Sequence, residues 1–231
     1  RHPRRTVVRS WRGAAAMGRL ELVGLFCVWY CFGALANVYC KEFLQAAADP
    51  LALTLAQYLM GAAASAAALL ARGADGLFAA RPGRREARLL LLVAAVNGVG
   101  HLMTNGSMGA VAVSFTHTVK AAEPLFSVAL SAALLGQAVS APLLAALAAI
   151  VAGTALASAT EFSYTHAGFA AAMASNLLFS LRNTVAKKLQ RPGARSAVAA
   201  DSLGLFLWLS LAGAALLLPP WAARAALAPP P

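Results

Sequence analysis

Charged side chains inside apolar stretches are the first candidates for chemistry in this sequence. Lys120 lies in the middle of such a stretch, with Thr116 four residues before it. His117 and Glu123 are three residues away on either side, so all of them share one neighbourhood on a helix. Pro124 lacks an N–H, so the carbonyl of Lys120 loses its intrahelical partner and the helix can bend there. A cation beside an opened helical turn suits an anion site, whereas the alternative is an internal Lys120–Glu123 pair that only packs helices.

The preceding apolar stretch contains a stripe of polar residues at helical spacing. Its members are Asn97, His101, Thr104 and Asn105. Asn97 lies four residues before His101, and Thr104 and Asn105 lie three and four residues after it. This spacing places all of them on one helix face. The stripe therefore either lines a polar cavity or forms hydrogen bonds to neighbouring helices.

Arg182 is a third candidate and lies near the end of a later apolar stretch. Its planar guanidinium matches the oxygens of a phosphate group. Because the stretch ends a few residues further on, the same side chain could instead extend to the membrane surface. The residues alone leave both interpretations open.

The reactive residues argue against an enzyme. The cysteines form no CxxC pair and the histidines form no HxxxH or HxxH pair, so paired metal ligands are missing from the sequence. The motifs GxxxxGKS/T, GxGxxG and GxSxG are absent, and the eight carboxylates are scattered along the chain. We therefore predict no catalytic residues, no metal site and no cofactor.

Long apolar segments must position these candidates. Apolar residues make up 60% of the 231-residue chain and charged residues 12%, against about 45–50% and about 25% in soluble domains. Since a helix needs about 20 apolar residues to cross a bilayer, this content suffices for about seven spans. The sequence predicts an all-α polytopic membrane helix bundle. The expected spans are 20–40, 51–71, 87–107, 111–135, 141–159, 166–186 and 201–219.

The distribution of charge supports seven spans. One helix over 87–135 would be about 73 Å long, too long for a bilayer core of about 30 Å, so we expect a turn near Gly106 and Gly109. With that turn, fifteen Lys and Arg residues fall on one side of the membrane and two on the other. Such asymmetry is typical of membrane topology and accounts for the net charge of +11 without a nucleic-acid partner.

The N-terminal residues differ from the rest of the chain. Residues 1–19 contain six arginines and no acidic residue, which is typical of an organelle transit peptide or of a basic segment beside a membrane. The sequence does not start with methionine, so we expect it to begin inside a longer reading frame. We expect the membrane domain to occupy residues 20–231.

The first and sixth expected spans have similar sequences at their C-terminal ends. Asn37 precedes Lys41 as Asn183 precedes Lys187, four residues apart in both cases. A repeat of five spans inserts in opposite orientations, which is the inverted-repeat arrangement of secondary transporters. Such a fold would have ten helices in two sets of five, and we expect this chain to be truncated at its C-terminus. The first repeat would cover about 20–159 and a partial second repeat about 166–219.

Three blocks of this sequence resemble the plastid phosphate translocators, a family of the drug/metabolite transporter superfamily. One block runs from Val111 to Pro124 and contains Lys120, the lysine in the middle of an expected span. The other two are residues 33–41 and 175–188, and the similarity extends over about residues 20–219.

The resemblance implies a ten-helix antiporter that exchanges inorganic phosphate for a phosphorylated C3, C5 or C6 compound by alternating access. It places Lys120 and Thr104 at positions that bind the phosphate, and His101 and Arg182 near the carbon moiety or the phosphate oxygens. It also implies a multi-pass protein of the plastid inner envelope, with the lipid bilayer as its environment and the basic loops on the stromal side.

Three alternatives remain open. One is a nucleotide-sugar antiporter of the Golgi or endoplasmic reticulum, from the same superfamily. The second is a truncated membrane protein that does not transport, and the third is a soluble Ala-rich helix bundle. The organic substrate is also open. Residues 123–128 resemble the phosphoenolpyruvate and hexose-phosphate branches of the family, whereas residues 181–183 resemble the hexose and pentose branches.

Overall fold

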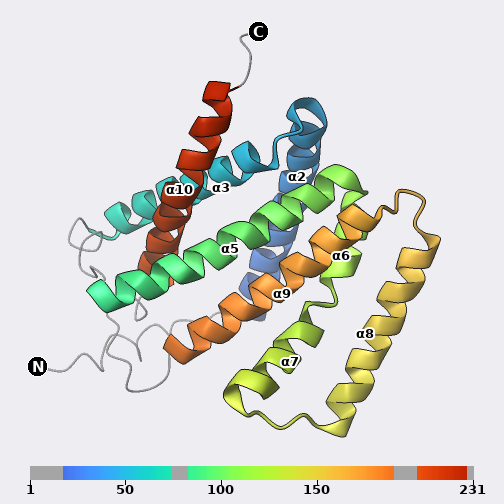
Figure 1. Cartoon of the computed structure of the whole chain (residues 1–231). Helices are drawn as coiled ribbons and strands as arrows, with labels where there is room; N and C mark the ends of the chain where they lie inside the picture. The colour runs from blue at the N-terminus through green and yellow to red at the C-terminus, as the bar shows by residue number, and fades with distance from the viewer. Residues whose placement is uncertain (1–17, 74–82, 190–201, 228–231) are drawn as a thin grey trace, which may run out of the picture. The chain divides into compact units, whose positions relative to one another are not determined.

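All regular secondary structure in the described part of the chain is helical. A computed structural model describes residues 18–73, 83–189 and 202–227. The chain divides into two units, Arg1–Glu42 and Phe43–Pro231, and each is described by itself. The helices shown in Figure 1 are α2 (Arg19–Ala47), α3 (Pro50–Ala71), α5 (Arg84–Ala110), α6 (Val113–Lys120), α7 (Glu123–Leu135), α8 (Ala141–Thr160), α9 (His166–Leu189) and α10 (Ser202–Leu227).

These helices confirm the predicted all-α polytopic membrane bundle. Within the described residues, six segments are long and apolar enough to cross a bilayer, and α6 and α7 count together as one of them. The sixth predicted span, 166–186, is the 24-residue helix α9, which is not among those six. Polar residues lower its hydropathy, and the helix buries Ser175, Asn176 and Ser180 completely. The predicted leader and most of the two basic loops, 74–82 and 190–201, lie outside the described residues.

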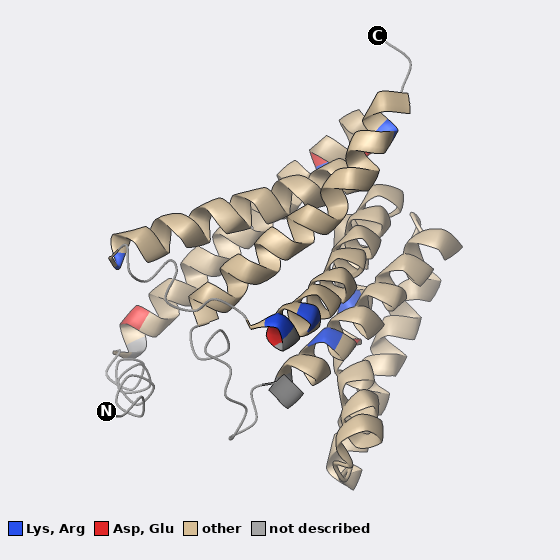
Figure 2. Ribbon diagram, turned by 60° about the vertical axis from the view of Figure 1, so that its left-hand side comes forward, with Lys and Arg blue, Asp and Glu red and all other residues tan. Residues whose placement is uncertain are grey.

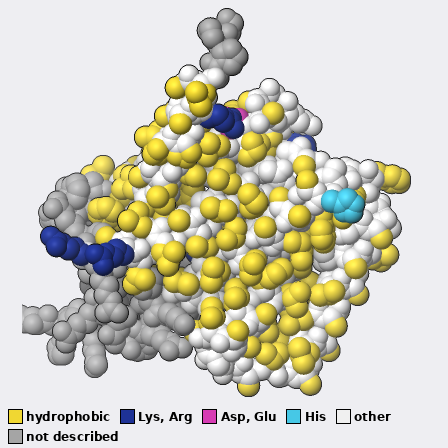
Figure 3. All heavy atoms as spheres, viewed as in Figure 1, with side chains coloured by type: hydrophobic (Ala, Val, Ile, Leu, Met, Phe, Trp, Pro, Cys, Tyr) yellow, Lys and Arg dark blue, Asp and Glu magenta, His cyan; other side chains and the backbone are white. Residues whose placement is uncertain are grey.

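Charged residues are sparse along the described helices, and most of the ribbon in Figure 2 is uncharged. Hydrophobic side chains cover much of the face formed by α5, α9 and α10 in Figure 3. Large exposed apolar residues such as Leu144, Leu156 and Phe206 lie on α8 and α10. A soluble protein rarely exposes so much contiguous apolar surface, whereas the surface suits a lipid environment.

Two antiparallel helix pairs organise the second unit. Helices α5 and α9 lie side by side (Figure 1), and a Cβ atom on Gly100 would stand only 3.0 Å from the Phe179 ring. Helices α3 and α10 form the other pair, in which a Cβ atom on Gly213 would meet the Tyr58 ring at 2.6–2.8 Å. Glycine at these two positions therefore lets an aromatic ring pack directly against a neighbouring backbone.

The last helix continues beyond its predicted end. We predicted that the seventh span ends at residue 219, but α10 runs through Pro219 and Pro220 to Leu227. Trp221 packs against the core cluster that contains Leu55 and Tyr58, so the turns after the prolines are held in place. Proline removes helical hydrogen bonds, and this packing offsets the loss.

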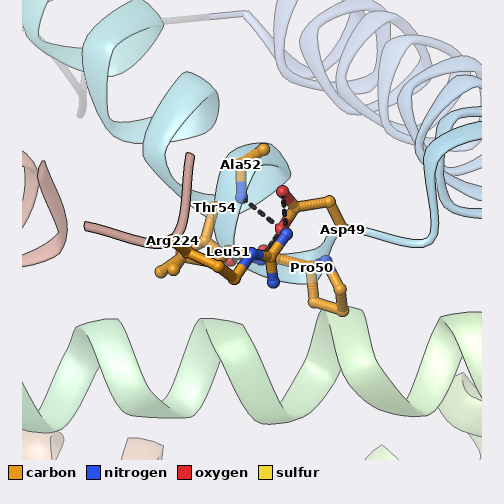
Figure 4. A network of polar contacts seen from close by, with 6 residues as sticks. All are labelled: Asp49, Pro50, Leu51, Ala52, Thr54 and Arg224. Carbon is orange, nitrogen blue, oxygen red and sulfur yellow. Dashed lines mark hydrogen bonds and ion pairs between the residues drawn. The ribbon is translucent and has the colours of Figure 1, made fainter. Parts of the chain in front are cut away.

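An ion pair holds the same end of α10. Arg224 pairs with Asp49, which also accepts hydrogen bonds from the backbone N–H groups of Leu51 and Ala52 at 3.0 and 2.9 Å (Figure 4). Asp49 thereby caps the N-terminus of α3. An open pocket of about 350 Å³ lies beside this pair and is lined by Asp49, Trp221, Arg224, Ala225 and Leu227.

The turn after α5 also lies slightly beyond its predicted place. Helix α5 continues past Gly106 and Gly109 to Ala110, and the chain turns at Val111–Ala112. The backbone N–H of Ala112 donates to the Ser163 hydroxyl at 2.9 Å. This hydrogen bond attaches the turn to the loop between α8 and α9. The glycines permit a turn, but they provide no such hydrogen bond.

Candidate functional site

Side chains of α9 form hydrogen bonds to the backbone at the break between α6 and α7. Pro124 has no N–H to continue the helix, and Ala121 and Ala122 separate the two parts. The Asn176 amide donates to the carbonyl of Val119 at 2.9 Å, and the Ser180 hydroxyl donates to the carbonyl of Glu123 at 3.2 Å. Side chains of α9 therefore bind backbone carbonyls on both sides of the break.

The break places Lys120 at the C-terminal end of α6, where the helix dipole favours a cation. Its ammonium group donates to Ser175 Oγ at 3.3 Å and lies 3.5 Å from Thr104 Oγ1. The ammonium also lies 4.4 Å from the centre of the Phe179 ring. The half-buried lysine is thus held by two hydroxyl groups and an aromatic face.

The alternative Lys120–Glu123 pair does not form. Within the described residues, no carboxylate lies within ion-pair distance of the Lys120 ammonium. The Glu123 carboxylate instead accepts a hydrogen bond from the Asn183 amide at 3.3 Å. In the part of the chain that the structure describes, the direct partners of the Lys120 ammonium are therefore neutral groups.

Arg182 points into the bundle and is held there by amide groups. Its NH1 group donates to Asn97 Oδ1 at 2.8 Å, while NH2 and Nε donate to Asn183 Oδ1 at 2.7 and 3.1 Å. The guanidinium carbon lies 5.4 Å from the centre of the Phe179 ring. These contacts favour the interior placement of Arg182 over extension to the membrane surface.

His101 forms part of an aromatic wall beside the two cations. Its ring meets the Phe179 ring edge-on with the centres 5.0 Å apart. The Tyr58 ring approaches its other side with the centres 5.7 Å apart. The histidine thus links α3, α5 and α9 by packing.

The four site residues predicted from the sequence lie around one ring. His101 and Thr104 come from α5, Lys120 from the end of α6 and Arg182 from α9, and Phe179 lies among them. Of the polar stripe on α5, only Asn105 points elsewhere, since its amide donates to Thr54 and Gln57 on α3 at 2.8 and 3.0 Å.

Sequence reasoning missed several residues of this site. They are Tyr58, Ser175, Phe179 and Asn183. The spacing of Ser175, Phe179 and Asn183 is four residues, so a search for one face of α9 that also carries Arg182 could have found them. Tyr58 gives no such signal, because only the packing of α3 on α5 brings it to the site.

The arrangement can bind an anion. Two cations from different helices lie against one aromatic ring, and their contacts are hydroxyl and amide oxygens. Hydrogen bonds from charged donors to an anion are about twice as strong as neutral ones. Half-buried cations without counter-charges are costly, so a doubly charged anion would relieve that cost.

Comparison with known proteins identifies similar chains. Residues 20–228 match the model of the Triose-phosphate Transporter family. A triose phosphate/phosphate translocator of non-green plastids from Brassica oleracea var. botrytis is 40% identical over 202 residues, which cover 87% of this chain and 48% of that protein. Phosphoenolpyruvate/phosphate translocator 1 from Arabidopsis thaliana gives the same values. Its counterpart from Oryza sativa subsp. japonica is 39% identical over 209 residues, with 90% and 49% covered. The chain thus spans about half the length of these curated relatives.

Proposed function

The chain belongs to the Triose-phosphate Transporter family, and we propose that it is part of an antiporter that exchanges inorganic phosphate for a phosphorylated C3, C5 or C6 compound. The names of its relatives support phosphate exchange against triose phosphate or phosphoenolpyruvate. Because these relatives are translocators, the proposal assigns the chain no catalytic step.

The observation that carries the proposal is the pair of cations around Phe179. Lys120 and Arg182 both contact this ring, and within the described residues neither forms an ion pair with a carboxylate. A phosphate dianion would accept hydrogen bonds from the Lys120 ammonium, the Thr104 hydroxyl and the Arg182 guanidinium. His101 would pack against the organic part of the substrate.

The same charges explain why exchange would be obligatory. Without a bound anion, the protein would have to change between the states open to the two sides of the membrane while two half-buried cations are unpaired. This change would be costly. A bound phosphate or phosphate ester removes that cost in either direction. Alternating access would follow from movement of the two repeats, about 20–159 and about 166–219, against each other.

We place the protein in a plastid membrane, as the chloroplastic relatives suggest. The proposed location is the inner envelope with the basic loops on the stromal side. A Golgi location would accompany the nucleotide-sugar alternative, which differs in its substrates.

Exchange in proteoliposomes tests the proposal. Vesicles loaded with phosphate and carrying the full-length protein should take up radiolabelled phosphate, and triose phosphate or phosphoenolpyruvate outside should compete. Lys120→Gln should abolish this uptake, whereas Arg88→Gln, which removes an exposed charge on α5, should leave it unchanged. Competition by UDP-sugars alone would support the nucleotide-sugar alternative. Near-normal exchange by Lys120→Gln would contradict the assignment of Lys120.

A further inference from the structure

The partners of Arg182 are unusual for a half-buried arginine. Its guanidinium forms three hydrogen bonds, and all of them end on the amide oxygens of Asn97 and Asn183. A carboxylate would match the guanidinium fork in shape and would cancel its charge. Among the described residues, the Glu123 carboxylate lies nearby, but it accepts a hydrogen bond from the Asn183 amide nitrogen at 3.3 Å and none from Arg182. Neutral oxygens therefore orient the arginine and leave its charge in place.

The orientation of the Asn97 amide is fixed by its two partners. Because a guanidinium only donates hydrogen bonds, the Asn97 oxygen must face Arg182. Its amide nitrogen then donates to the Tyr58 hydroxyl at 2.6 Å. Asn97 and Tyr58 are 7% and 6% exposed, so water does not replace either partner. A chain of two hydrogen bonds thus connects α3, α5 and α9.

The guanidinium keeps donors for a ligand. Three of the five N–H groups that an arginine carries are used in the bonds to Asn97 and Asn183, so two remain within the described residues. The Phe179 ring, which contacts both the Lys120 ammonium and the Arg182 guanidinium, limits how far the guanidinium can move.

We propose that Asn97, oriented by Tyr58, is a positioning residue that holds Arg182 toward the anion site without neutralising it. The inference rests on the proposed phosphate site and deepens it. If Asn97 only stabilised the fold, an aspartate would serve at least as well, because it has the same shape and would form a stronger pair with the arginine. The Tyr58 hydroxyl can donate to that aspartate, so the substitution leaves no group unpaired.

The substitution Asn97→Asp separates these two roles. The purified 231-residue chain in lipid nanodiscs is titrated with inorganic phosphate, and its melting temperature reports binding. We expect Asn97→Asp to melt at or above the temperature of the parent without phosphate. We expect its apparent Kd for phosphate to rise at least about tenfold, since the carboxylate cancels one charged donor.

Two further variants complete the test. Gln137→Glu adds the same charge on the exposed loop between α7 and α8 and should keep the parent's Kd. Tyr58→Phe removes the partner that orients Asn97 while Arg182 keeps its charge, so we expect a smaller rise in Kd, about threefold.

The outcomes distinguish the inference from the proposed function. If the parent binds phosphate and Asn97→Asp binds it equally well, the positioning role is wrong and the phosphate site stands. A lower melting temperature of Asn97→Asp together with an unchanged Kd in Tyr58→Phe would assign Asn97 a structural role only. If the parent itself shows no response to phosphate up to millimolar concentrations, the proposed function fails and the inference fails with it.

Discussion

At the scale of single residues, the site is defined by charge without direct counter-charge. Lys120 and Arg182 are held by hydroxyl groups, amide oxygens and the Phe179 ring. The sequence could predict these two residues because a charge inside an apolar helix is costly and therefore conspicuous. It could not predict Phe179, because a phenylalanine in an apolar span has no such cost and only the packing of α9 on α5 shows its place.

The Thr104 hydroxyl should contribute to phosphate affinity. Thr104→Val keeps the shape of the side chain and removes the group that lies beside the Lys120 ammonium. The loss of one hydrogen bond costs about 1 kcal/mol, so the apparent Kd for phosphate should rise about fivefold. The melting temperature, measured at increasing phosphate concentrations, reports this Kd.

Thr154→Val is the matched control for that substitution. Thr154 on α8 is 9% exposed, as Thr104 is, and it has no hydrogen bond to either cation in the described part of the chain. Its replacement should leave the Kd unchanged. Equal Kd values for both variants and the parent would remove Thr104 from the site.

At the scale of elements, one broken helix and two close helix pairs position the site. The break at Ala121–Ala122 is fixed to α9 by Asn176 and Ser180, so α6 presents Lys120 at its end. The sequence predicted the break from Pro124 alone. It could not predict that side chains of α9 would bind the carbonyls of Val119 and Glu123 beside the break, since hydrogen bonds between distant segments leave no local pattern.

The pairing of α3 with α10 should depend on Gly213. A methyl group there would meet the Tyr58 ring at 2.6–2.8 Å, so Gly213→Ala should destabilise the protein by about 1–3 kcal/mol through overpacking. Gly153 on α8 has no atom within 4 Å of the added carbon. Gly153→Ala should therefore be neutral or stabilise by about 0.5–1 kcal/mol through helix propensity. Thermal unfolding in nanodiscs compares the two, and equal melting temperatures would contradict this packing.

At the scale of the whole molecule, the sequence predicted the positions of the helices better than the contacts between them. Helices occur at all seven expected spans, because apolar length and charge asymmetry act over the whole chain. The helices differ from the expected spans at their ends. Helix α10, for example, continues past two prolines, where contacts of Trp221 and Arg224 stabilise its last turns. Such extensions depend on tertiary partners that a local pattern does not contain.

Accessibility of single cysteines tests the seven-span topology. In a background without Cys27, Cys31 and Cys40, cysteines at Gln137 and Ser196 should react from the side of the basic loops. Phe162→Cys, in the exposed loop between α8 and α9, should react from the opposite side with a membrane-impermeant reagent. If the cysteines at positions 162 and 196 react from the same side, α9 does not cross the membrane.

Equilibrium binding of radiolabelled phosphate to the purified chain in nanodiscs tests the central claim most directly. The parent should bind phosphate saturably, and the Lys120→Gln variant, with a melting temperature close to the parent's, should not. Retained binding by Lys120→Gln, or equal displacement of phosphate by a neutral sugar and by triose phosphate, would contradict an anion site built on Lys120.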